Sequence, residues 1–141
     1  MSAQTIKILI AGLLLVHGLG HIGPLLAIFF TWSQGTGRWL PARSWLFPSL
    51  SANAAKNIAS LFWILSLIGF VAAAAAFWGF LLPGDLWRIL AIPSAVVSLA
   101  GIVIFLGTWP TFNTIAALGV NVAVLVALLW LNWPPQAMFG K

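Results

Sequence analysis

The sequence predicts an all-α membrane protein, a transmembrane four-helix bundle in which the helices run up, down, up and down. Of the 141 residues, 62% are apolar and only 5% are charged, whereas a soluble domain devotes about 25% of its residues to charge. Mean hydropathy is +1.11. Four stretches are apolar over about 20 residues or more, the length that a helix needs to cross the hydrocarbon core of a bilayer. We therefore expect one integral membrane domain over residues 1–141.

We expect the four helices at about residues 5–30, 57–82, 86–108 and 112–133. The first is too long for the apolar core of a signal peptide, so we expect it to be retained. Turn residues follow the second and third, at Pro83-Gly84 and Trp109-Pro110, and Pro134-Pro135 closes the last. Such short connections make consecutive helices antiparallel neighbours.

One connection is long, residues 31–56, and we expect it to lie along the membrane interface with a short helix near residues 49–55. It combines tryptophan with arginine, which suits the head-group layer. Tryptophan also marks two interfacial belts, with Trp63 alone well inside a span. The belts comprise Trp78, Trp87, Trp130 and Trp133 on one side and Trp32, Trp39, Trp45 and Trp109 on the other.

Charge and cysteine content exclude several classes of site. The chain has no cysteine and only one acidic residue, which excludes disulfides, Cys-ligated metals and paired-carboxylate catalysis. Six cations spread along the chain form no basic patch, so we expect attraction to anionic lipid and no nucleic-acid partner. Three cations fall on each side of the predicted bundle, which leaves the membrane orientation undecided.

The most distinctive feature is a pair of histidines, His17 and His21, in the first predicted helix. At four residues apart they lie about 40° from each other on one helix face. Both fall near mid-span, where polar groups are costly and normally face the protein interior. Two such imidazoles can bind one metal together, but the chain offers no third His, Cys or Glu, so we expect no metal site.

Three interpretations of this pair stay open. The first is a structural network with polar residues of the other helices, namely Asn121, Ser94, Ser98 and Thr114. In the second, His17 or His21 is an axial ligand to a haem or a chlorophyll-type pigment. In the third, the histidines and Asn121 handle protons or a small molecule.

The segment Val16-His17-Gly18-Leu19-Gly20-His21, with Trp109 and Phe112 at the start of the fourth helix, resembles a family of small bacterial membrane proteins. These have four helices and an HGxxH-type first helix, and they are loosely similar to the DoxX group. The resemblance implies a four-helix bundle and no established activity, and only His17 and His21 map onto its motif. Where the family pattern implies an Asn early in the fourth helix this chain has Ala117, with Asn121 one turn later.

From these observations we expect a protein without its own catalysis, an accessory or structural subunit of a larger complex in the inner membrane of a bacterium. Its partners would be the lipid bilayer and other membrane protein subunits. The alternatives are a haem- or pigment-binding redox protein and a small transporter or proton relay.

Overall fold

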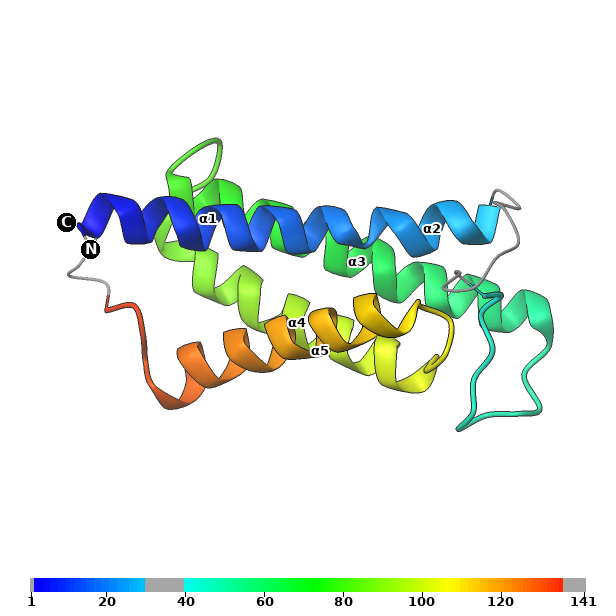
Figure 1. The fold of residues 1–141 in the computed structure, drawn as a ribbon. Coiled ribbons are helices and arrows are strands. Elements are labelled where there is room, and N and C mark those ends of the chain that lie inside the picture. Colours follow the sequence, from blue (N-terminus) through cyan, green and yellow to red (C-terminus); the bar gives the residue numbers. More distant parts are fainter. Residues whose placement is uncertain (1, 30–39, 136–141) are drawn as a thin grey trace.

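The computed structural model describes residues 2–29 and 40–135, and within those ranges the regular structure is entirely helical. The first span consists of α1 (Ala3–Gly20) and α2 (Ile22–Phe29), and the second is α3 (Ala52–Trp78). The third combines the short 3₁₀ helix η1 (Gly84–Leu86) with α4 (Trp87–Ile104), and the fourth combines α5 (Thr111–Leu125) with the π-helical turn η2 (Val126–Trp130). All four are long and apolar enough to cross a membrane, and they alternate in direction (Figure 1). The predicted four-helix membrane fold is confirmed.

The second span begins and ends earlier than expected because of its caps. The Ser51 hydroxyl accepts a hydrogen bond from the backbone N–H of Ala54 at 3.2 Å, so the helix begins at Ala52 and not at residue 57. The short separate helix expected at residues 49–55 is therefore wrong, since most of that stretch is the first turn of α3. At the other end, Gly79 takes a left-handed conformation with φ of 78°, which stops the helix four residues before the expected end.

The remaining spans differ from the prediction at their ends. The first is interrupted at His21, between α1 and α2. The third ends at Ile104 and not at residue 108, before a turn in which Gly107 has φ of 91°. The fourth ends at Trp130, in a π-helical turn, three residues short of the expected end.

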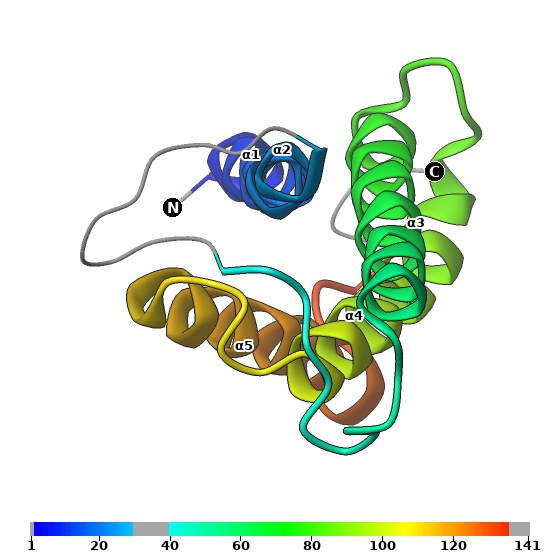
Figure 2. The ribbon, with the colours of Figure 1, turned by 90° about the vertical axis from the view of Figure 1, so that its right-hand side faces the viewer.

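The four spans form an open arc and not a closed square. α1 packs on α3, α3 on α4 and α4 on α5, whereas α1 and α5 at the two ends of the arc do not pack closely along their backbones (Figure 2). Glycines permit the tight contacts. A Cβ at Gly18 would lie 2.9 Å from the Cβ of Phe70, and one at Gly101 would lie 2.8 Å from the Cβ of Phe62.

Two of the tryptophans expected in the interfacial belts belong to the core instead. Trp87 and Trp109 are only 5% and 6% exposed. Trp87 stacks edge-on against Phe77, with ring centroids 4.7 Å apart, and Trp109 packs in the same way on the buried Trp63 at 6.1 Å. Trp87 is the first residue of α4, and Trp109 lies in the connection between α4 and α5.

Only part of the long connection is described, since residues 30–39 lie outside the described ranges. The described part, residues 40–51, has no helix and is attached to the third span and its following turn. The backbone N–H of Leu40 donates to the carbonyl of Thr108 at 2.8 Å, and the indole N–H of Trp45 donates to the carbonyl of Val103 at 2.6 Å. The segment therefore lies across one end of the bundle.

Candidate functional site

Four polar side chains from three helices meet in the middle of the bundle. The His17 Nε2 of α1 lies 2.9 Å from the Oδ1 of Asn121 in α5. The Asn121 Nδ2 donates to the hydroxyl of Ser98 in α4 at 2.7 Å. That hydroxyl lies 2.8 Å from the Nε2 of His21, whose Nδ1 lies 3.0 Å from the main-chain carbonyl of His17. The chain of hydrogen bonds thus returns to the residue from which it starts.

The chemistry of the partners fixes the direction of every bond in this ring. A carbonyl oxygen only accepts, so His21 Nδ1 carries a proton and, in the neutral imidazole, Nε2 accepts from the Ser98 hydroxyl. The same argument at the Asn121 oxygen places a proton on His17 Nε2. With both imidazoles neutral, the ring therefore runs from the His17 side chain through Asn121, Ser98 and His21 to the His17 carbonyl. Bonds aligned in one direction polarise one another.

The break between α1 and α2 makes this closure possible. In an undistorted α-helix the His17 carbonyl would accept from the backbone N–H of His21. Here that N–H donates to the Gly18 carbonyl instead, at 3.1 Å. Pro24 lies one turn later, has no N–H and crowds the Gly20 carbonyl, which favours such a distortion. The freed His17 carbonyl then accepts from the His21 side chain.

The site is almost closed to its surroundings. His21, Ser98 and Asn121 are fully buried, whereas His17 is half-buried. The ring of Phe70 from α3 packs edge-on against His17, with centroids 4.7 Å apart, and Trp109 packs edge-on against His21 at 5.4 Å. Aromatic walls exclude water and strengthen the hydrogen bonds between the polar groups.

The other residues predicted for the network bond within their own segments. The Ser94 hydroxyl donates to the Leu90 carbonyl at 2.6 Å, and the Thr114 hydroxyl lies 3.1 Å from the Pro110 carbonyl. The structure thus unites Asn121 and Ser98 with the two histidines and leaves Ser94 and Thr114 apart. Sequence reasoning missed the aromatic walls: Trp109 looks interfacial by position, and nothing distinguishes Phe70 from the other aromatics of its helix.

The arrangement restricts the chemistry open to the histidines. A metal or haem iron needs a free imidazole lone pair, and both ring nitrogens of His21 are engaged, so the His21 environment does not fit an axial ligand. His17 keeps one nitrogen, Nδ1, without a hydrogen bond to any described residue. Among residues 2–29 and 40–135 no group of three potential metal ligands comes together.

Comparison with known proteins gives no match with a family model, a curated protein or a solved structure. The resemblance to the HGxxH membrane proteins stays a prediction.

Proposed function

We propose that this protein performs no catalysis of its own and acts as an accessory or structural subunit of a larger membrane complex, in the inner membrane of a bacterium. The observation that carries the proposal is the closed ring of hydrogen bonds. The polar groups near mid-span hold three spans together. Both ring nitrogens of His21 and the side chains of Ser98 and Asn121 are engaged in hydrogen bonds, so these groups are not poised to act as a base or nucleophile, and only the Nδ1 of His17 is left.

The ring also counts against a proton relay. Proton transfer along a chain of hydrogen bonds requires each member to accept a proton on one side and release one on the other. Hydroxyl and imidazole groups do so, but the amide of Asn121 donates from nitrogen and accepts at oxygen, so it has no equivalent neutral form to pass through. Asn121 therefore links α1 to α5 by a hydrogen bond but does not pass protons along the ring.

The outer faces of the bundle supply surface for lateral contacts. The first and fourth spans, at the ends of the open arc, are the least covered, with 28% and 22% of their most apolar windows buried inside the chain, against 39% for the other two. Large apolar side chains project from α5, among them Ile115, which is 65% exposed. A neighbouring subunit placed against the outer face of α5 would cover these exposed side chains.

Isolation in mild detergent tests the proposal. We expect the tagged chain to co-purify with other membrane proteins in a particle clearly larger than a 15.1 kDa chain in its micelle. Ile115→Trp should weaken this association. The matched control is Ile68→Trp on the outer face of α3, where the native side chain is 60% exposed. This control should leave the association with other membrane proteins unchanged. A strictly monomeric particle with no companion chains would contradict the proposal.

A second candidate, a haem- or pigment-binding protein, depends on His17 alone. The free Nδ1 of that half-buried ring is the one imidazole lone pair left by the network. An absorption spectrum of the purified protein decides the matter. A Soret or chlorin band that disappears in His17→Ala would support the candidate, and a spectrum with tryptophan absorption alone would remove it.

A further inference from the structure

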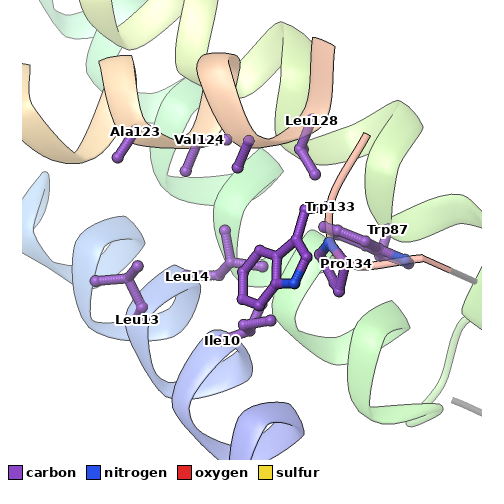
Figure 3. Close-up of a pocket in the computed structure, with 10 residues that line it drawn as sticks. Ile10, Leu13, Leu14, Trp87, Ala123, Val124, Leu128, Trp133 and Pro134 are labelled. Carbon is purple, nitrogen blue, oxygen red and sulfur yellow. The ribbon is translucent and has the colours of Figure 1, made fainter. Parts of the chain in front are cut away.

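A cavity of about 150 Å³ lies between the first and fourth spans, in the half of the bundle where α1 begins and the fourth span ends. Figure 3 shows its walls: Leu13 and Leu14 from the first span, and Val124 and Leu128 from the fourth. It occupies the place where α1 and α5 fail to pack closely against each other. The cavity is therefore a consequence of the open arc and not a packing defect within a closed core.

The lining selects against water and for hydrocarbon. Every side chain shown in Figure 3 is apolar apart from the indole N–H groups of Trp87 and Trp133. A water needs two to four polar partners to occupy a site, whereas apolar cavities of about 150 Å³ stay dry and admit small hydrocarbons. Leu13 and Trp133 are 47% and 41% exposed, so the walls are accessible from outside. In a membrane, what lies outside these side chains is the acyl layer.

The cavity ends at mid-span. One turn beyond Leu14 and Val124 stand His17 and Asn121, whose hydrogen bond joins the two helices. A chain that enters from the interface therefore meets a polar bridge at the middle of the bilayer.

The opposite end carries positive charge. Arg88 follows Trp87 directly, and its guanidinium lies 5.4 Å from the ring centre of that tryptophan. Arg88 also donates to the side chain and carbonyl of Asn132 and to the carbonyl of Pro134, which lines the cavity. These bonds use three of the five guanidinium N–H groups. One N–H on Nη1 and the buried Nε–H are left without a partner in the described part of the chain. Lys7, one turn before Ile10, is a second cation at this end.

These cations have no anionic partner in the described part of the chain. Asp85 is the one acidic residue of the sequence, and neither Arg88 nor Lys7 forms an ion pair with it there. An apolar cavity that ends beside unpaired cations at the interface is complementary to an amphiphile with an anionic head and a hydrocarbon tail.

We propose that this cavity binds one acyl chain of an anionic glycerophospholipid, with the phosphate beside Arg88 and the chain between α1 and α5. The lipid completes the contact that the two helices do not make with each other. The site does not depend on the accessory role proposed above, since a monomer would bind the lipid equally.

The test measures lipid retention by the full chain after purification in detergent. Native mass spectrometry is performed after incubation with equimolar phosphatidylglycerol and phosphatidylcholine carrying the same acyl chains. We expect one phosphatidylglycerol per chain in preference to phosphatidylcholine. Ala127→Phe, which fills the cavity, should weaken retention about tenfold, equivalent to about 1.4 kcal/mol. Val122→Phe, on an exposed position of the same helix that does not line the cavity, should leave retention unchanged.

Two further arms keep the proposal open to refutation if Ala127→Phe misfolds. Phosphatidylglycerol with a photoreactive acyl chain should label the wild-type peptides around Leu13 and Ala127, and labelling spread evenly over the outer face of α3 would overturn the proposal. Arg88→Gln should remove the preference for phosphatidylglycerol. Equal retention of the two lipids by the wild-type protein would show that the headgroup is not recognised, and it would also overturn the proposal.

Discussion

His17 and Asn121 join the first and fourth spans, which do not pack closely along their backbones. The imidazole Nε2 of His17 donates to the amide oxygen of Asn121 at 2.9 Å, across the open side of a bundle whose other neighbouring spans are in close backbone contact. The Asn121 amide then continues to Ser98 at 2.7 Å, so one side chain links α1, α4 and α5. This residue therefore holds a position where no apolar side chain could replace it.

Asn121→Ala should destabilise the fold by about 1–2 kcal/mol. Each hydrogen bond between membrane helices contributes about 0.6 kcal/mol on average, two are lost, and the His17 N–H is left partly buried without its partner. Unfolding in mixed micelles of mild detergent and dodecyl sulfate measures the change.

The matched control for Asn121 lies on the same helix. Asn113 is exposed two turns earlier, so Asn113→Ala should leave the free energy of unfolding within about 0.5 kcal/mol of the wild-type value. Equal effects of the two substitutions would mean that the Asn121 bonds contribute nothing specific.

The two histidines should be neutral and in opposite tautomers. The direction of the ring places the proton on Nε2 of His17 and on Nδ1 of His21. Nitrogen-15 NMR of the imidazole rings distinguishes these forms. Ser98→Ala removes the hydroxyl that donates to His21 Nε2 and should shift the His21 imidazole resonances. The control is Ser94→Ala. It should leave the His21 resonances at their wild-type positions, because the Ser94 hydroxyl donates to a carbonyl of its own helix.

A spectrum in which both rings carry the proton on the same nitrogen would contradict the closed ring. So would a spectrum that Ser98→Ala leaves unchanged. Neither result depends on knowing what the protein binds.

The four spans could be predicted from sequence because apolar length alone determines them. The pairing of His17 with Asn121 was accessible for a similar reason, since both fall at the same depth on their helices. The residues at which the helices begin were harder to predict from the sequence. Ser51 is a good N-cap by residue type, yet it lies in a segment whose tryptophans and arginines indicate an interface.

The choice between Ser94 and Ser98 could not be made from sequence. They are one turn apart on the same face of α4, and only the packing against α3 separates them. A Cβ at Gly69 would lie 2.0 Å from the Ser94 hydroxyl, so this serine sits against the backbone of α3, while Ser98 faces His21. The hydrogen bond from the His21 side chain to the His17 carbonyl could not be predicted from sequence either, because it depends on a local distortion of the helix near Pro24.

Arg88 should hold the segment after the fourth span. It donates to the side chain and carbonyl of Asn132 and to the carbonyl of Pro134. Arg88→Met keeps the apolar stem and removes these donors. We expect the backbone N–H of Trp133, which donates to the Ala127 carbonyl at 2.8 Å, to exchange with solvent about tenfold faster, since local opening then costs less. Lys7→Met, which removes a cation at the same end, should leave this amide protected.

Gly18 should be intolerant of even one added methyl group. A Cβ there would lie 2.9 Å from the Cβ of Phe70 and 3.2 Å from the backbone nitrogen of Val71, and neither can move without displacing α3. Gly18→Ala should therefore cost about 1–3 kcal/mol, the usual effect of overpacking. It should also lengthen the hydrogen bond between His17 and Asn121 by pushing α1 outward, which the imidazole NMR spectrum would register.

Gly12 provides the matched control within the same helix, because nothing lies within 4 Å of a Cβ placed there. Gly12→Ala should leave stability unchanged or raise it by up to about 1 kcal/mol, as expected for alanine in a helix. If Gly18→Ala proved as harmless as Gly12→Ala, the close approach of α1 to α3, on which the geometry of the histidine site depends, would be wrong.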